Sequence, residues 1–310
     1  MNHPDLSPNR RAFLKSAAAG LAAAGALGRT AGAQDAAAAD AVPKSDPASW
    51  YVAKNGNINQ SVVSWCYKPV TVEELIEASH KMGCKSVELI PPSYWPLLKE
   101  RGMTCAIAGS HGFAKGFAHT EEHEECLAKL RESIDACHEF GCKNVITFSG
   151  FRRELTTEDG FKNMVDGLKK IMPYAEEKKV NICLEMLNSR VEENMKGHPD
   201  YMCDDMDWAV EICKAVGSER AKVLFDIYHV QIMQGDVIKR LRQYKDYIGH
   251  YHTAGNPGRC EIDDRQEINY PGIMKAIVET GYDGYVGQEF IPQDKDILKS
   301  LNDGVRICDV

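Results

Sequence analysis

The chain lacks two features that would place it with nucleic-acid or membrane proteins. Lysine and arginine number 37 against 45 aspartates and glutamates, which gives a formal net charge of -8. This deficit of positive charge argues against a nucleic-acid partner, because such binding depends mainly on neutralising phosphates. The mildly apolar stretch from Ser16 to Leu27 is too short to cross a bilayer as an ordinary helix. We therefore expect no nucleic acid and, after processing, no membrane among its partners.

The first 33 residues have the order of a twin-arginine export signal. Arg10 and Arg11 lie in a twin-arginine pattern, an Ala-rich stretch follows, and Ala31-Gly32-Ala33 is a small-residue cleavage site. An Ala-rich helix of the folded domain is the alternative. No cysteine lies near the cleavage site, which argues against a lipid anchor. We predict a signal peptide over 1–33, a linker and N-terminal segment over 34–58, and a periplasmic or otherwise exported location.

The cysteines do not have the arrangement of a disulfide scaffold. There are 11 of them, so at least one lacks an intramolecular partner. Cys183 falls in a strand-like run, and Cys137 and Cys213 fall in helical stretches. We therefore predict that most are buried free thiols, which behave as small apolar side chains.

From Asn59 onward, short apolar runs alternate with helix-length amphipathic stretches. The predicted strands are Ser61–Tyr67, Ser86–Ile90, Thr104–Ser110, Asn144–Ser149, Asn181–Leu187, Lys222–Tyr228, Ile248–Ala254 and Tyr285–Ile291. Eight such units predict an α/β protein with a single-domain (β/α)₈ TIM barrel over residues 59–310. A doubly wound open sheet is the alternative, but no glycine-rich dinucleotide fingerprint follows the first strand.

The predicted helices have recognisable ends. Four of them stop at a glycine, the residue that most often follows a helix, at Gly83, Gly141, Gly217 and Gly281. A further helix is predicted over Asp159–Lys178, where we expect Pro173 to kink or divide it because proline removes a backbone donor.

Ligand-type side chains stand at the ends of four of these strands, at Glu185, Asp226, His252 and Glu289. The C-terminal ends of barrel strands meet at one mouth, so we expect the four side chains to converge. Two glutamates, an aspartate and a histidine suit a divalent cation such as Mg²⁺, Mn²⁺ or Zn²⁺. Taken singly, each has a structural alternative: an internal salt bridge, a helix cap or a hydrogen-bonded histidine.

Glu185 and Glu289 are also the candidate catalytic residues. Strands five and eight are expected on opposite sides of the barrel, so their carboxylates could flank a substrate. One would remove a proton beside a carbonyl and the other would return it to the neighbouring carbon. The metal would hold the substrate oxygens and stabilise the enediolate.

Five more residues near the strand ends are candidate substrate contacts, namely His229, Arg259, Glu88, His111 and Asn188. Arg259 could hold a carboxylate or hydroxyl by a bidentate contact, or it could be solvated surface. His250 alternates with His252, so both point the same way and His250 is expected deeper in the barrel. Trp65 and Tyr67 could wall the pocket or belong to the core.

The combined motifs resemble the hydroxypyruvate isomerase family, which belongs to the xylose isomerase-like TIM barrels with the ketose 3-epimerases and the endonuclease IV group. They are Glu185 with Asn188, Asp226-x-x-His229, Asn256-Pro257-Gly258-Arg259, Glu267-Ile268-Asn269-Tyr270 and Gly281-Tyr282-x-Gly284-Tyr285-Val286-Gly287-x-Glu289. The resemblance covers roughly residues 59–292. It implies a divalent metal held by Glu185, Asp226, His252 and Glu289, with the two glutamates as the acid–base pair. At position 252 the hydroxypyruvate isomerases carry Gln, whereas the ketose 3-epimerases carry His.

We therefore expect a metal-dependent isomerase or epimerase of a keto-sugar or small hydroxy-carbonyl compound, with a small-molecule carbohydrate as its partner. A 3-keto-glycoside lyase would share the same proton abstraction, and a non-catalytic periplasmic sugar-binding protein would not need the paired glutamates. An abasic-site endonuclease would need extra metal ligands where this chain has Arg259-Cys260-Glu261. Assembly into a homo-oligomer is left open.

Overall fold

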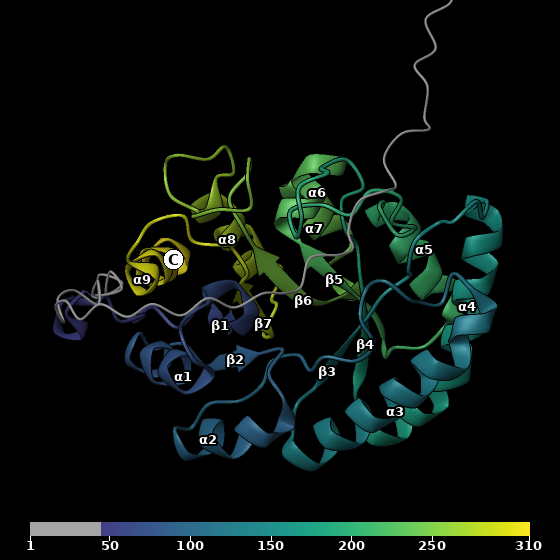
Figure 1. Ribbon diagram of the computed structural model, residues 1–310, viewed down its shortest axis with the longest axis horizontal. Coiled ribbons are helices and arrows are strands. Elements are labelled where there is room, and N and C mark those ends of the chain that lie inside the picture. The colour runs from purple at the N-terminus through teal and green to yellow at the C-terminus, as the bar shows by residue number, and fades with distance from the viewer. Residues whose placement is uncertain (1–44) are drawn as a thin grey trace, which may run out of the picture. The chain divides into compact units, whose positions relative to one another are not determined.

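The computed structural model describes residues 45–310, so the export signal predicted over 1–33 lies outside the described residues. One sheet of parallel strands occupies the centre, and helices surround it (Figure 1). Its strands are β1 (Asn59–Val63), β2 (Ser86–Glu88), β3 (Asn144–Thr147), β4 (Asn181–Glu185), β5 (Ala221–Asp226), β6 (Ile248–Thr253) and β7 (Tyr285–Gln288). Their order is β2-β1-β7-β6-β5-β4-β3, so most neighbours in the sheet are also successive along the chain.

The third predicted strand, Thr104–Ser110, is the one that does not form a regular strand. Its two ends still make parallel bridges, from Thr104 to Ser86 beside β2 and from Ala108 to Val145 in β3. Between them the backbone N–H of Ala106 donates to the side chain of Ser86 at 2.8 Å instead of continuing a backbone ladder. The segment thus closes the ring between β2 and β3. The barrel expected from the sequence is confirmed, with one irregular segment in place of a regular strand.

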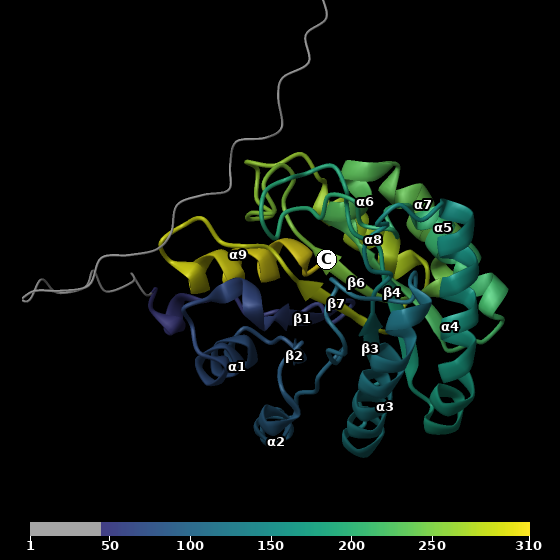
Figure 2. The same ribbon diagram turned by 45° about the vertical axis from the view of Figure 1, so that its right-hand side comes forward.

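The helices are α1 (Val72–Lys81), α2 (Trp95–Glu100), α3 (His123–Phe140), α4 (Thr157–Lys178), α5 (Met206–Val216), α6 (Ile227–Met233), α7 (Val237–Gln243), α8 (Tyr270–Glu279) and α9 (Ile297–Cys308). The two longest, α3 and α4, pack side by side (Figure 2). The four glycines predicted to end helices all have positive φ, between 77° and 91°, which glycine adopts without steric cost. No helix of residues 45–310 is long and apolar enough to cross a membrane.

Pro173 does not divide α4, contrary to the expectation from the sequence. Proline leaves the carbonyl four residues earlier without its helical donor, and that carbonyl belongs to Lys169. Both residues are exposed, so water can satisfy the carbonyl and the helix continues.

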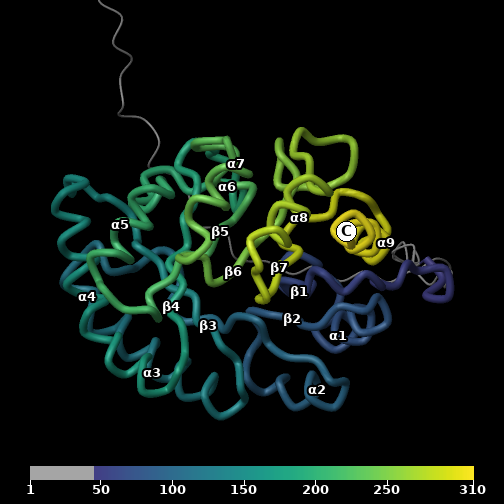
Figure 3. The backbone as a smooth tube through the Cα atoms, turned by 180° about the vertical axis from the view of Figure 1, so that it is seen from behind, coloured from purple at the N-terminus to yellow at the C-terminus, as the bar shows by residue number. Residues whose placement is uncertain are grey.

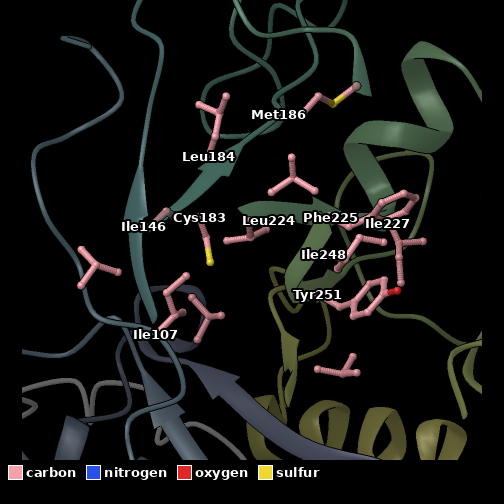
Figure 4. Close-up of a cluster of buried hydrophobic side chains, with 14 of the residues drawn as sticks. Ile107, Ile146, Cys183, Leu184, Met186, Leu224, Phe225, Ile227, Ile248 and Tyr251 are labelled. Carbon is pink, nitrogen blue, oxygen red and sulfur yellow. The ribbon is translucent and has the colours of Figure 1, made fainter. Parts of the chain in front are cut away.

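Buried apolar side chains from successive strands pack into one cluster (Figure 4). Ile107 of the irregular segment lies in the same cluster as Ile146, Cys183 and Leu224, which shows that this segment contributes to the core like a strand. All eleven cysteines are free, and all but Cys260 are buried. The prediction of free, apolar thiols is therefore confirmed.

The start of the described chain lies along α9 (Figure 3). The backbone of Tyr51 exchanges hydrogen bonds with the Asn302 amide, and its hydroxyl donates to Asp309 at 2.6 Å. The same carboxylate accepts from the backbone N–H of Lys54 at 2.9 Å. Part of the predicted N-terminal segment is thus fixed to the last helix of the barrel.

Candidate metal centre

The four predicted metal ligands converge at the C-terminal ends of four strands. Glu185 ends β4, Asp226 ends β5, His252 lies near the end of β6, and Glu289 follows β7. Each offers one ligand atom, all four atoms lie within 4.8 Å of one another, and all four residues are buried. The register of the sheet aligns Asp226 with His252, which places two of the ligands side by side.

The two glutamates are not on opposite sides of the barrel, as the sequence had led us to expect. Only β5 and β6 separate β4 from β7 in the sheet. The four ligands therefore come from four adjacent strands and form an arc along one part of the mouth. The two strands are three positions apart around the ring, whereas opposite strands of an eight-membered ring are four positions apart.

Asp226 uses its two carboxylate oxygens differently. Oδ1 accepts the backbone N–H groups of Tyr228 and His229 at 2.8 and 3.2 Å, and so caps α6. Oδ2 is buried without a hydrogen-bond donor. Burial raises the pKa of Asp226 to about 8, and the charge of Glu289 adds to the effect. The neighbouring positive groups thus do not offset burial and the other carboxylates, and a divalent cation would supply further positive charge.

His252 presents its two ring nitrogens to opposite sides. Nε2 lies 2.8 Å from Glu88 Oε1, toward the barrel interior. Nδ1 lies 2.9 Å from Glu289 Oε2 and 3.6 Å from Glu185 Oε1, at the mouth. Burial lowers the pKa of His252, but the charge of Glu289 and the contacts with Glu185, Glu289 and Glu88 together outweigh it and raise the pKa well above its usual value. A raised pKa favours a proton on Nδ1, which faces the same carboxylate oxygens that would share a metal ion with it.

Arg259 reaches into the same group of carboxylates. Its Nη2 lies 2.6 Å from Glu289 Oε2 and 3.7 Å from Asp226 Oδ2, and its side chain is 3% exposed. Burial raises the pKa of Glu289, but the positive charges of Arg259 and His252 together outweigh it and hold that pKa well below its usual value. Arg259 is therefore part of the site and not solvated surface, one of the two alternatives that the sequence left open.

The hydrogen bonds of His229 determine which of its nitrogens carries the proton. The backbone N–H of Asn188 donates to Nδ1 at 3.0 Å, so in the neutral ring the proton is on Nε2. Nε2 is buried without a hydrogen-bond partner and lies 3.7 Å from Asp226 Oδ2. His229 thus offers an unused donor beside the ligands, as expected of a residue that binds a substrate oxygen.

The other three predicted substrate contacts have partners within the protein. The Asn188 amide donates to His229 and Lys196 and accepts from Val191. His111 lies 2.9 Å from the Thr147 hydroxyl through Nε2. Their roles as substrate contacts stay predictions, and their hydrogen bonds favour supporting roles.

Glu88, the last of these candidates, lies beneath His252 and is completely buried. Its Oε1 accepts from both His252 and His250, each at 2.8 Å. Burial raises the pKa of Glu88, but the two histidines outweigh it and lower the pKa to about 2. The expectation that His250 lies deeper in the barrel is confirmed.

Aromatic residues complete the surroundings. Trp65 donates to Glu289 Oε1 at 3.3 Å and stacks on Arg259, whereas Tyr67 is fully buried in the core. The sequence analysis missed His198, whose ring lies 4.4 Å from Phe113 between ring centroids and 6.1 Å from His229. No strand end marks His198, because it lies in the long segment between β4 and α5.

Sequence comparisons find similarity to named isomerases. A 2-oxo-tetronate isomerase of Cupriavidus necator is 39% identical over 114 residues, which span 37% of this chain and 41% of that protein. The hydroxypyruvate isomerase of Escherichia coli is 27% identical over 224 residues, which span 72% of this chain and 79% of that protein.

Solved structures share the fold. An AP endonuclease of family 2 from Brucella melitensis has a TM-score of 0.71 at 22% identity and covers 79% of this chain and 97% of its own. The IOLI protein, solved with a zinc atom, has a TM-score of 0.64 at 15% identity, and the match covers 81% of this chain and 96% of that protein. The family model of the xylose isomerase-like TIM barrel matches residues 76–305. With this match, and with four ligand-type residues at adjacent strand ends, the chain belongs to the xylose isomerase-like TIM barrel family.

Proposed function

We propose that this chain is a divalent-metal-dependent isomerase or epimerase of a keto-sugar or a small hydroxy-carbonyl compound. The observation that carries the proposal is the group of four buried ligand atoms within 4.8 Å, two of which belong to glutamates. The names of the two sequence relatives, both isomerases, support the same class of reaction.

Glu185, Asp226, His252 and Glu289 would hold the metal. Oδ2 of Asp226 is buried without a hydrogen-bond partner, and Nδ1 of His252 faces the oxygens of Glu289 and Glu185. Both atoms are therefore placed to hold a metal ion. When bound, a cation such as Mg²⁺, Mn²⁺ or Zn²⁺ supplies Lewis-acid polarisation of a substrate carbonyl. The zinc in the structurally similar IOLI protein is consistent with this proposal.

The residues of the chain would then move one proton between neighbouring carbons. One of Glu185 and Glu289 removes the proton beside the carbonyl, and the other returns it to the next carbon or to the opposite face. The two differ in their surroundings, since Glu289 receives the Arg259 guanidinium and the Trp65 indole N–H. His229 donates its Nε2–H to a substrate oxygen and so helps to orient the substrate.

The test is incubation of candidate ketoses, 3-keto-glycosides and hydroxypyruvate in D₂O with added Mn²⁺ or Mg²⁺. Deuterium at the carbon beside the carbonyl of a rearranged product supports the isomerase or epimerase. Release of an aglycone identifies the lyase, which shares the first proton transfer. Sugar binding without deuterium uptake and without turnover would favour a sugar-binding protein and refute our proposal.

An exported location is a separate part of the proposal. It rests on Arg10 and Arg11 and on the small-residue site at Ala31-Gly32-Ala33, all outside the described residues. Replacing both arginines with lysine should leave the precursor in the cytoplasm, as fractionation and blotting would show. Export that continues unchanged would mean that the N-terminus is not a twin-arginine signal.

A further inference from the structure

The proposed metal ligand His252 has a second set of contacts on the side away from the mouth. There, Glu88 Oε1 accepts hydrogen bonds from Nε2 of His252 and Nε2 of His250, both at 2.8 Å. All three side chains are 0% exposed. Nothing in the acid–base chemistry of the mouth uses Glu88 or His250, so their burial needs another explanation.

The strands bring these residues together from distant parts of the chain. His250 and His252 alternate along β6, so both point inward, and their rings are 4.9 Å apart and perpendicular. Glu88 comes from the end of β2, which β1 and β7 separate from β6 in the sheet. It therefore has to reach past β7 to contact the two histidines.

Gly287 of β7 provides the room for this contact. A Cβ atom at position 287 would lie 2.5 Å from Glu88 Oε1 and 2.9 Å from His252 Cδ2, closer than real Cβ contacts. A side chain there would push the carboxylate and the imidazole apart. The missing side chain thus allows the close approach of a strand to the buried pair.

We propose that Glu88, itself held by His250, is a positioning residue that fixes the ring of His252 and keeps its proton on Nε2, so that Nδ1 faces the metal. The inference rests on the metal of the proposed function. Its physical basis is general: a metal-binding histidine usually donates its other N–H to a carboxylate, which orients the ring and makes the ligand nitrogen more basic. His250 contacts the same oxygen of Glu88 and so limits rotation of the carboxylate.

A second metal site is the competing explanation, because the donor atoms of Glu88, His250 and His252 also lie within 4.8 Å of one another. The distances favour hydrogen bonds instead. Both nitrogens approach one oxygen at 2.8 Å, which is the distance of a hydrogen bond to a carboxylate and longer than a bond to a metal. The number of metal ions bound per chain separates the two explanations.

The experiment is a Co²⁺ titration of chelator-treated protein, followed by visible absorption, for the wild type and for Glu88→Gln and Gly287→Ala. Glu122→Gln is the matched control, because it removes a buried carboxylate that contacts Gly116 and Arg153 and none of the four ligands. We expect one ion per chain throughout and affinity about 10–100-fold weaker in the two test variants. The control should keep wild-type affinity, and thermal unfolding would verify that each variant is folded.

A spectroscopic measurement tests the protonation state directly. In ¹⁵N-histidine-labelled, metal-loaded wild type, two-bond ¹H–¹⁵N spectra should show His252 protonated at Nε2 only. His250→Gln keeps an N–H donor for Glu88 and should retain most of the affinity for Co²⁺, whereas His250→Leu should lose it.

The outcomes separate this inference from the proposed function. A wild type that binds no Co²⁺ overturns both. A wild type that binds Co²⁺ tightly, with folded Glu88→Gln equal to it, overturns the inference and leaves the metal site intact. Two ions in the wild type and one in Glu88→Gln would make the interior group a metal site and overturn its positioning role.

Discussion

The imidazole of His252 contacts buried carboxylates on both of its edges, and the two sides are stabilised in different ways. On the interior edge of His252, Glu88 receives two N–H donors and its pKa falls to about 2. On the mouth edge, Asp226 leaves Oδ2 without a donor and its pKa rises to about 8. Glu88 Oε2 and Asp226 Oδ2 both lack a hydrogen-bond partner, so the two groups differ in charge. In the interior one carboxylate contacts two histidines, whereas at the mouth three carboxylates share His252 and Arg259.

This difference between the two sides of His252 indicates that a cation is needed at the mouth. Burying a charge is costly unless it is paired and hydrogen-bonded, so an incompletely paired group persists where function requires it. Arg259 and the proton on His252 partly balance the mouth in the absence of a metal. The shortest contacts of both groups are to Glu289, whereas Arg259 lies 3.7 Å from Asp226 Oδ2, which has no hydrogen-bond partner.

The largest expected effect is on the rate of proton exchange, which should depend on Glu185 at the mouth far more than on Glu88 in the interior. Glu185→Gln should lower proton exchange about 10²–10⁴-fold even at saturating metal, since it removes a positioned acid–base group. Glu88→Gln should lower exchange at limiting metal and recover most of it when metal is raised. Deuterium incorporation measured across a metal titration distinguishes the two, and equal recovery of both variants would contradict the assignment of Glu185.

Replacing Asp226 tests whether its two oxygens have separate functions. Asp226→Asn keeps an oxygen that can cap α6 but removes the charge, whereas Asp226→Ala removes both. We expect both to lose the metal, as elemental analysis would show. In metal-free protein, Asp226→Asn should unfold at a temperature at or above that of wild type, because uncompensated repulsion is relieved. Asp226→Ala should unfold lower, since a lost helix cap costs about 0.5–2 kcal/mol. Wild-type metal content in Asp226→Asn would remove this residue from the site.

The pH dependence of stability gives an intermediate effect. Asp226 has a folded pKa of about 8, far above the value near 3.9 of an unfolded chain, so its ionisation increasingly destabilises the folded protein as pH rises from 4 to 8. His252, whose folded pKa is also raised, loses its stabilising contribution in the same direction above pH 6.5. Glu88 and Glu289 have lowered pKa values, and their contributions are already complete above pH 5.

Chelator-treated protein should therefore lose stability between pH 6.5 and 8, by up to about 1.4 kcal/mol per pH unit for each such group. Below pH 6.5 the lowered pKa values of His198 and His229 act in the opposite direction, because there the unfolded chain binds more protons at these histidines than the folded one. Saturating Mn²⁺ should reverse or flatten this slope, because metal binding favours the deprotonated ligands. Urea unfolding at several pH values measures the slope with and without metal. A metal-free slope of the opposite sign would show that Asp226 is already balanced by protein groups.

The smallest effect concerns a carboxylate far from the mouth. Asp309 accepts from the Tyr51 hydroxyl and from the backbone N–H of Lys54, so, like Glu88 Oε1, its carboxylate receives two donors from the protein. Asp309→Asn should lower the unfolding temperature by about 2–4 °C, the shift that 1 kcal/mol gives in a domain of this size. Its metal content and affinity should equal those of the wild type. Loss of metal in this variant would mean that the two ends of the molecule are coupled.

Most of the fold and the identity of the four candidate ligands were predictable from local patterns. Alternating apolar runs and amphipathic stretches indicated the barrel, and Glu185, Asp226, His252 and Glu289 could be selected because each ends such a run. The irregular segment at Thr104–Ser110 was not predictable, because it depends on the Ser86 side chain replacing one backbone partner.

The sequence by itself determined which residue types stand at the strand ends, because the period of apolar residues and the glycines that end helices are local properties. Only the tertiary structure decided that the ligands form an arc on adjacent strands, that His198 comes near His229, and that Glu88 supports His252 across Gly287. These contacts join residues as far apart as 164 positions in the chain. Their geometry depends on how the barrel closes, which no single strand or helix specifies.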